Sequence, residues 1–414
     1  LVLPAPLPTP VIAWSLTDLD AAAAVVVTAS HNPPSDNGYK VYLGDGAQIV
    51  PPHDTGISAR IAEVDPTAVA LSAEDDPLIE GLGDNPLERY LAAVPDVRLR
   101  PDAPGVTVVY TPMHGVGGDV AVRAFAAAGF NDVVVVAEQF APDPTFPTVA
   151  FPNPEEPGAM DLVIALAAEQ DALLAVANDP DADRLGAAIP QPDGSWRRLG
   201  GDELGWLLAD HILRHTEGDD RLVVTTLVSS SLLSEMAADH GVHSAETFTG
   251  FKWIGRTILD RPDERFVFGY EQALGYLVAE RPLDKDGITA AVMLAEVAAV
   301  AAVEGTTLQA RLDDITARYG WHRIADRSIT MDPAAAARRV KALEADPPTE
   351  LGGAAVIGVE SYPEADLLRL TLEGGVRVQV RPSGTEPKVK LYGEAVDADP
   401  TPFLDALAPL LTVR

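Results

Sequence analysis

Short apolar runs alternate with alanine-rich stretches along the first three quarters of the chain. Residues 106–110 and 132–136 are rich in valine and have the length of buried strands, and residues 119–128 between them have the spacing of a helix. A strand, a helix and a second strand in this order are typical of parallel sheets covered by helices. The pattern therefore predicts an α/β fold with largely parallel sheets.

The alternation continues downstream, where we expect strands and helices in turn at residues 161–169, 172–177, 201–213, 222–226, 232–240, 265–268 and 288–303. The pattern then changes, because three later runs alternate apolar and polar residues as antiparallel strands do. These strands are expected at residues 367–372, 376–380 and 389–393, with helices at 333–344 and 402–411.

These two patterns predict three similar mixed α/β domains and a C-terminal α+β domain with an antiparallel sheet. Segments rich in proline, glycine and acidic residues, near 100–104, 217–219 and 320–321, provide the boundaries. The predicted domains are residues 1–100, 101–218, 219–321 and 322–414.

The composition of the 414-residue chain is that of a globular protein, with 47% hydrophobic and 22% charged residues. No apolar run reaches the roughly 18 residues that a membrane span needs, and no cysteine is present. These features are compatible with a cytoplasmic enzyme. The net charge of −32 disfavours nucleic acid and anionic membranes as partners. Any phosphate site must therefore be a local cluster of arginine, lysine and backbone N–H groups.

The segment Thr28-Ala29-Ser30-His31-Asn32-Pro33 directly follows an apolar run at residues 21–27. Ser30 at the end of a strand is a candidate nucleophile, which would need a base or a metal nearby. Taken alone, such a segment is more often an ordinary turn.

Asp179, Asp181 and Asp183 follow a second apolar run, at residues 172–177. At a spacing of two, their carboxylates point to one side of an extended segment and can converge on one cation. Oxygen ligands without cysteine or histidine favour magnesium over zinc. A solvated acidic turn is the alternative. A nucleophilic serine and a hard-cation site together favour phosphoryl transfer.

Four motifs in this order resemble those of the α-D-phosphohexomutase family, in particular its phosphoglucomutase and phosphopentomutase branch. They are the serine segment with Asn37-Gly38-Tyr39-Lys40, the aspartate loop, Gly269-Tyr270-Glu271-Gln272-Ala273-Leu274-Gly275-Tyr276, and Arg381-Pro382-Ser383-Gly384-Thr385-Glu386-Pro387-Lys388. The resemblance implies four domains around a central active-site cleft. It also implies a reaction that moves phosphate between two positions of a sugar through a bisphosphorylated intermediate, such as glucose 1,6-bisphosphate.

The resemblance makes Ser30 the phosphoserine and a further ligand of the magnesium ion, with His31 and Lys40 assisting charge and proton balance. Arg184 would reach the transferring phosphate. The loop containing Thr249 and Gly250 would face the sugar, as would Lys252, a candidate general acid or base.

Glu271 would bind two sugar hydroxyls. Ala273 and Gly275 depart from the serine and histidine that other branches carry there. The distal phosphate would be held by Arg381, Ser383, Gly384, Thr385 and Lys388.

Several questions stay open at this stage. Glucose phosphate is the expected substrate, with mannose phosphate and ribose or deoxyribose phosphate as alternatives. A metal-dependent phosphomonoesterase and a non-catalytic paralogue are the rival functions. The enzyme is expected to be a monomer or homodimer. Only 29 residues precede Ser30, so we expect the N-terminal part of domain I, with its arginine loop, to be missing. His114 and the Asp284-Lys285-Asp286 segment are left outside the predicted site.

Overall fold

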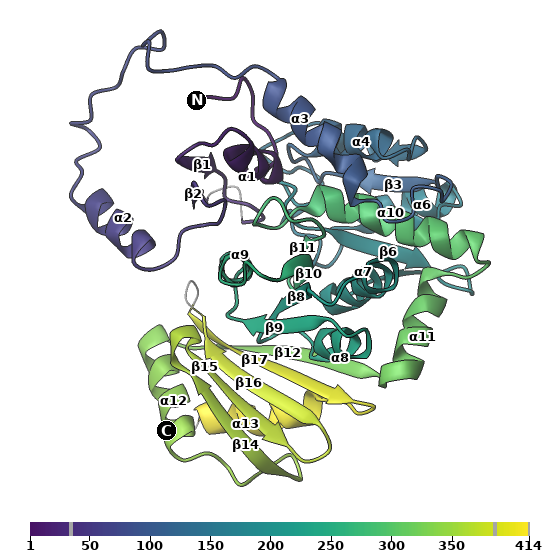
Figure 1. Ribbon diagram of the computed structural model, residues 1–414. Helices are drawn as coiled ribbons and strands as arrows, with labels where there is room; N and C mark the ends of the chain where they lie inside the picture. The colour runs from purple at the N-terminus through teal and green to yellow at the C-terminus, as the bar shows by residue number, and fades with distance from the viewer. Residues whose placement is uncertain (33–35, 384–386, 413–414) are drawn as a thin grey trace.

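The computed structural model of the protein describes residues 1–32, 36–383 and 387–412. Its described strands form four separate sheets, and the C-terminal sheet lies below the other three in Figure 1. The four-domain architecture, with mixed α/β content and an antiparallel C-terminal sheet, confirms the predicted fold class. The exact domain boundaries stay a prediction.

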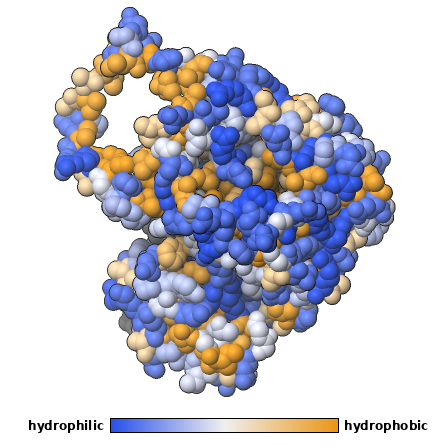
Figure 2. Space-filling view, in the orientation of Figure 1, coloured by the Kyte–Doolittle hydropathy of each residue, from blue (hydrophilic) through white to orange (hydrophobic). Residues whose placement is uncertain are grey.

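The N-terminal domain contains an antiparallel pair of strands, and not the parallel sheet expected from the alternation of elements. Its elements are α1 (Thr9–Asp18), β1 (Ala23–Val27), β2 (Tyr39–Leu43), α2 (His53–Ala62), α3 (Asn85–Ala93) and the short 3-10 helix η1 (Val94–Val97). Helix α2 has no buried residue. It and the segment after it project from the body of the molecule at the left of Figures 1 and 2. Leu71 and Leu78 of that segment are 91% and 90% exposed.

The second sheet has the order β4-β3-β5-β6-β7. Strands β4, β3 and β5 are parallel, whereas β6 and β7 return antiparallel. The elements of this region are β3 (Val108–Thr111), α4 (Gly118–Ala127), β4 (Val133–Val135), α5 (Ala137–Phe140), α6 (Asp161–Glu169), β5 (Leu174–Ala177), β6 (Gly186–Pro190) and β7 (Trp196–Arg198).

The third sheet has the order β11-β10-β8-β9, with β10, β8 and β9 parallel. Its strands are β8 (Arg221–Thr226), β9 (His243–Thr247), β10 (Arg265–Glu271) and β11 (Gly275–Leu277). The helices of this region are α7 (Gly201–His215), α8 (Leu232–Asp239), α9 (Phe251–Leu259), α10 (Gly287–Val303) and α11 (Leu308–Tyr319).

The fourth sheet is antiparallel, in the order β12-β17-β16-β15-β14-β13. It contains β12 (His322–Thr330), β13 (Glu350–Leu351), β14 (Ala354–Tyr362), β15 (Leu367–Leu372), β16 (Val376–Pro382) and β17 (Lys388–Val396). Helices α12 (Pro333–Ala345) and α13 (Thr401–Thr412) pack on it, and the 3-10 helix η2 (Pro363–Ala365) joins β14 to β15.

Helix α10 joins the first three domains. Apart from Thr289 and Glu296 its residues are apolar, and it is buried along most of its length, in contact with α4, α7 and β11. A helix that is hydrophobic all round is stable only inside a core. One continuous core accordingly extends from α1 and α3 through the second sheet to α11. The C-terminal domain has a core of its own.

Among the described residues, no single helix is long and apolar enough to span a membrane. The sharply bent pair α10 and α11 passes that test together, on length and composition alone.

A buried charge lies in the middle of α10. The Glu296 carboxylate accepts hydrogen bonds from Arg98 Nε at 2.8 Å, from His211 Nε2 at 2.9 Å, and from the backbone N–H groups of Leu99 and Arg100 at 2.8 and 2.9 Å. The glutamate therefore ties the linker between the first two domains to α10 and α7.

Replacing Glu296 with alanine should lower the free energy of unfolding by about 3–5 kcal/mol, because it leaves the buried Arg98 charge without its partner. Urea denaturation followed by circular dichroism measures the loss. Glu304→Ala is the matched control, since its ion pair with Arg311 is half-exposed and should contribute at most about 1 kcal/mol. Equal midpoints for the two variants would contradict the role of Glu296.

Candidate active site

The three aspartates lie in a tight turn directly after β5. Ala182 N donates to Asp179 O at 2.8 Å, and Ala182 has a left-handed φ of 55°. The spacing of the aspartates predicted an extended segment, but the structure shows a tight turn. The turn brings one oxygen of each carboxylate within 4.8 Å of the others. All three aspartates are at least 96% buried.

Two lysines from distant elements neutralise this turn. Lys40 Nζ on β2 lies 2.7 Å from Asp181 Oδ2 and also bonds Asp183 Oδ2. Lys285 Nζ, just before α10, lies 3.0 Å from Asp183 Oδ2. Burial alone would raise the pKa of Asp183, but Lys285 and Lys40 hold it below its usual value. Burial, together with the neighbouring aspartates, raises the pKa of Asp179 to about 8.

The remaining oxygens of the turn are suited to a metal ion. Asp181 Oδ1 and Asp183 Oδ1 are buried and have no hydrogen-bond partner among the described residues. A buried carboxylate oxygen without a donor is costly unless a cation or a ligand satisfies it. The aspartate turn is therefore able to bind a metal, and its oxygen ligands suit a hard cation.

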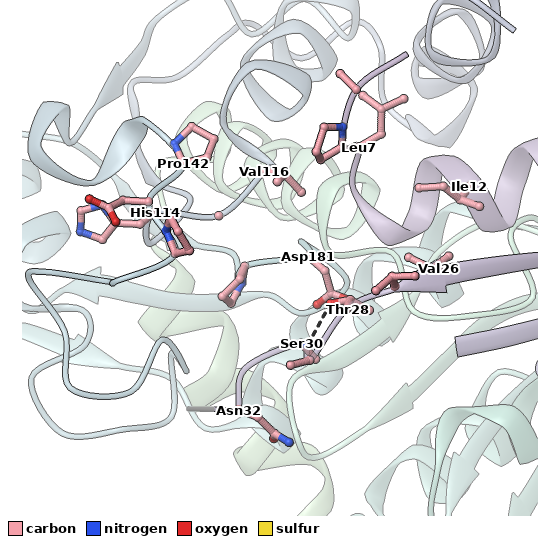
Figure 3. A pocket seen from close by; sticks show the side chains of 18 of the residues that line it. Leu7, Ile12, Val26, Thr28, Ser30, Asn32, His114, Val116, Pro142 and Asp181 are labelled. Atoms are coloured by element: carbon pink, nitrogen blue, oxygen red, sulfur yellow. Dashed lines mark hydrogen bonds between the residues drawn. The ribbon is translucent and has the colours of Figure 1, made fainter. Parts of the chain in front are cut away.

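Ser30 lies against the aspartate turn, with a left-handed φ of 53°. Its Oγ donates to Asp179 Oδ2 at 3.2 Å and lies 3.1 Å from His31 Nδ1. Both Ser30 and Asp181 line a cavity of about 780 Å³, shown in Figure 3. Burial, with a contribution from Arg184, lowers the pKa of His31 to about 4. The imidazole is therefore neutral at pH 7.

Arg184 lies at the end of the aspartate turn. Its backbone N–H donates to Asp179 Oδ1 at 3.1 Å, and its guanidinium lies 4.0 Å from Asp179 Oδ2 and 3.5 Å from Glu155 Oε2. Arg184 Nε is buried without a hydrogen-bond partner among the described residues. A guanidinium held this loosely has donors available for a phosphate.

Glu271 is the last residue of β10 and is buried. Its Oε1 accepts the backbone N–H of Gly250 at 3.0 Å, so the glycine loop and the carboxylate meet as the motif predicts. Thr249 Oγ1 is buried and without a partner among the described residues. Lys252 contacts other residues: its Nζ lies 4.0 Å from an Asp54 carboxylate oxygen and over the ring of Trp253. Its role as acid or base stays a prediction.

The described part of the fourth motif lies at the ends of β16 and β17. Arg381 on β16 is opposite Lys390 on β17, and Ser383 N donates to Lys388 O at 2.8 Å. Arg381 and Glu271 both act on Tyr392, whose pKa is raised to about 12 mainly by burial. Gly384 and Thr385 lie outside the described residues.

Sequence reasoning missed Lys285, which it treated as part of a helix cap. Asp286 does cap α10, but the Lys285 ammonium reaches the aspartate turn. Gly275 makes this possible, because a Cβ there would lie 2.5 Å from Lys285 Cδ. The scarcity of lysine, with six in the chain, was the available signal. Thr9 was also missed, although its Oγ1 donates to Asp181 Oδ2 at 2.6 Å.

His114 lines the same cavity as Ser30 and Asp181. Its side chain is buried, and Nε2 lies 2.8 Å from Thr148 Oγ1. The neighbouring Gly115 packs on Pro180, where a Cβ would lie 2.4 Å from the proline backbone. Only glycine fits this close contact, and the contact supports the aspartate turn.

Comparison with known families decides the identity. Sequence models of phosphoglucomutase/phosphomannomutase α/β/α domains I, II and III match residues 1–68, 88–194 and 200–319, and a model of the C-terminal domain matches residues 326–401. The chain belongs to the phosphoglucomutase/phosphomannomutase family. All four predicted motifs lie within the matched ranges, so the resemblance noted in the sequence is confirmed.

Individual relatives cover most of the chain. A Haemophilus influenzae protein named "Probable phosphomannomutase" is 41% identical over 96% of this chain and 82% of its own length. Human phosphopentomutase is 35% identical over 94% of this chain and 70% of its own. A crystal structure of a phosphoglucomutase/phosphomannomutase family protein from Burkholderia thailandensis superposes with a TM-score of 0.75 at 21% identity, covering 98% and 81% of the two chains. This family member is therefore a phosphosugar mutase, an intramolecular phosphotransferase.

Replacing Asp181 with asparagine should weaken magnesium binding by at least about tenfold, or 1.4 kcal/mol, because the turn loses a charged ligand. Isothermal titration of each protein with magnesium chloride gives the dissociation constants. Asp193→Asn is the control, since this aspartate lies in an exposed turn. Unchanged affinity in Asp181→Asn would show that the aspartate turn is not the metal site.

Proposed function

We propose that this mutase interconverts hexose 1-phosphate and hexose 6-phosphate, with glucose as the preferred sugar. A phosphoserine at Ser30 would carry the transferred group, magnesium would bind at Asp179, Asp181, Asp183 and the Ser30 oxygen, and a sugar bisphosphate would be the intermediate. The observation that carries the proposal is the 3.2 Å contact between the Ser30 hydroxyl and the Asp179 carboxylate. This contact joins a nucleophile to a buried, oxygen-lined turn.

A charge count at the turn supports both the phosphoserine and the metal. Lys40, Lys285 and Arg184 face the three aspartates. Because the pKa of Asp179 is about 8, this carboxyl is largely protonated at pH 7 before a cation binds, and its ionisation on cation binding would bring the count to three carboxylates and three cations. A phosphoryl group on Ser30 would add roughly −1.5 to −2 units of charge. A divalent cation restores the balance, and when bound it withdraws charge from the transferring phosphoryl group.

The transfer can be written with the residues of this chain. A sugar hydroxyl oxygen forms the new bond to phosphorus as the bond from phosphorus to Ser30 Oγ breaks. His31, whose Nδ1 lies 3.1 Å from Ser30 Oγ, would take the hydroxyl proton and pass it to the departing Ser30 oxygen. Lys40 and Arg184 would hold the phosphoryl oxygens. After the bisphosphate turns round, the reverse step returns its other phosphate to Ser30.

Two further sets of residues would hold the rest of the substrate. Glu271 would accept hydrogen bonds from two sugar hydroxyls, beside Thr249 and Gly250. The distal phosphate would be bound by the fourth motif, with Arg381 as a bidentate donor and Lys388 as a point charge, helped by Ser383, Gly384 and Thr385. The sugar is thus held at both ends.

Fewer observations support the choice of glucose as the sugar. The relatives carry the names phosphomannomutase and phosphopentomutase, so these activities are the alternatives, and a non-catalytic paralogue is a weaker one. Other relatives are named glucose 1,6-bisphosphate synthase, which fits glucose 1,6-bisphosphate as activator or intermediate. A cytoplasmic location and a monomeric or homodimeric state stay predictions.

Ser30→Ala should abolish conversion of glucose 1-phosphate to glucose 6-phosphate, because the phosphate carrier is lost. A dehydrogenase-coupled assay of the product measures the rate, and intact mass shows the phosphorylated fraction of the unchanged protein. Ser195→Ala, in an exposed turn, is the control and should be fully active.

Mannose 1-phosphate and ribose 1-phosphate assayed in parallel decide the sugar. Release of inorganic phosphate in place of isomerisation would contradict the mutase mechanism, as would full activity of Ser30→Ala.

A further inference from the structure

We propose that Thr9 is a positioning residue for the metal site. Its hydroxyl holds Asp181 Oδ2, so that Asp181 Oδ1 is left available to the cation. The inference rests on the proposed magnesium site and deepens it, because it names the group that orients one of the ligands. Thr9 belongs to α1 of the N-terminal domain, whereas Asp181 lies in the turn after β5.

Two hydrogen bonds join Thr9 to Asp181. Thr9 Oγ1 donates to Asp181 Oδ2 at 2.6 Å, and Thr9 N donates to Asp181 O at 3.0 Å. Thr9 has no exposed surface, so bulk water does not compete for either bond. Pro8 and Pro10 flank it, and proline restricts its own backbone and that of the residue before it. A stiff backbone and two hydrogen bonds thus fix the direction of the Asp181 carboxylate.

Asp181 and Asp183 divide their oxygens in the same way. Asp181 Oδ2 accepts from Thr9 Oγ1 and from Lys40 Nζ, and Asp183 Oδ2 contacts Lys40 Nζ and Lys285 Nζ. The Oδ1 atom of each aspartate is buried and has no hydrogen-bond partner among the described residues. Because the Oδ2 atoms are already paired with protein donors, the Oδ1 atoms are the ones left for a cation.

Lys40 cannot orient Asp181 in the same way as Thr9. The Lys40 ammonium is shared between Asp181 and Asp183, and in the proposed mechanism it also holds phosphoryl oxygens. The Thr9 hydroxyl bonds Asp181 alone in the hydrogen bonds of the described residues. A neutral donor orients a metal ligand without adding a positive charge that would compete with the metal. Thr9 therefore keeps Asp181 Oδ2 occupied when the lysine turns to the phosphate.

Helix α1 also connects this metal ligand to the strand that leads to the nucleophile. Thr9 is the first residue of α1, and the helix packs against β1. Ile12 of α1 lies beside Val26 of β1 in an apolar cluster (Figure 3). Strand β1 ends at Val27, shortly before Ser30. One rigid helix thus carries the donor to Asp181 and supports the strand before Ser30.

A fixed ligand direction matters more for magnesium than for calcium. Magnesium requires nearly ideal octahedral geometry, whereas calcium accepts flexible arrangements of oxygen ligands. Hydrogen-bond partners that orient metal ligands typically change metal affinity by about 10- to 100-fold. Loss of the Thr9 hydroxyl should therefore weaken magnesium binding more than calcium binding. A loss of ligand charge, or a general loss of structure, would weaken both metals.

Thr9→Val tests the inference, because valine keeps the shape of the side chain and removes the hydroxyl. Isothermal titration with magnesium chloride, and separately with calcium chloride, gives the two dissociation constants. We expect the magnesium constant to rise about 10- to 100-fold and the calcium constant to rise by a factor at least about fivefold smaller. Thr9→Ser keeps the hydroxyl and should bind both metals as the unmodified protein does. Thr17→Val is the matched control on the same helix, since the Thr17 hydroxyl donates only to Trp14 O in the hydrogen bonds of the described residues, and it should change neither constant.

The possible results separate this inference from the proposed function. If the unmodified protein binds no magnesium, the proposed metal site is wrong. If it binds magnesium but folded Thr9→Val binds both metals unchanged, or loses affinity for both by the same factor, the inference is overturned. Thermal unfolding without metal checks that each variant folds, and Thr9→Ala repeats the comparison if the valine variant does not. A selective loss of magnesium affinity that serine restores supports the inference.

Discussion

Three buried carboxylates in one turn impose the constraint around which this molecule is organised. Burying ionised groups is costly unless each is paired or hydrogen-bonded. Here the cations come from different parts of the fold. Lys40 comes from β2 of the N-terminal domain, Arg184 from the turn itself and Lys285 from the start of α10. The aspartate turn is therefore the point where the first three domains must meet.

The contacts around Lys285 show how the meeting point is held. The Asp284 carboxylate accepts hydrogen bonds from Tyr42 Oη at 2.5 Å and from Gln48 Nε2 at 2.7 Å, and both donors belong to the N-terminal domain. Asp286 caps α10 and accepts Tyr90 Oη at 2.9 Å. The lysine between them thus has a fixed backbone on both sides. In a chain with a net charge of −32, these fixed cations offset the carboxylates of the turn, which would otherwise repel a phosphate.

Sequence reasoning worked best where chemistry and periodicity coincide within a short segment. The strand at 367–372 and the helix at 161–169 have the predicted bounds, and the Ser30 and Asp179 segments do meet. The prediction was weaker for residues whose contact partners lie far away in the sequence. The contacts of Lys285 and Thr9 depend on packing between elements that no local pattern encodes. The short antiparallel pair in the N-terminal domain was missed because strand direction depends on connections, not on composition.

The same distinction explains the aspartate turn. Its residue types and their order were sufficient to predict a cation site. The tight-turn geometry depends on the left-handed conformation of Ala182, which could not be predicted from the sequence. Ala273 and Gly275 looked like lost contacts. In the structure, Gly275 instead provides the space through which the Lys285 side chain passes. A departure from a motif can therefore make room for a side chain from elsewhere in the chain.

The central claim is that Ser30 and the aspartate turn act as one unit that passes phosphate to a sugar. A single-turnover experiment tests it most directly. Enzyme carrying radiolabelled phosphate on Ser30 is mixed with excess glucose 1-phosphate, with magnesium or with a chelator. We expect rapid transfer of the label to the sugar with magnesium and retention on the protein with chelator. Label released as inorganic phosphate, or transferred equally fast in chelator, would contradict it.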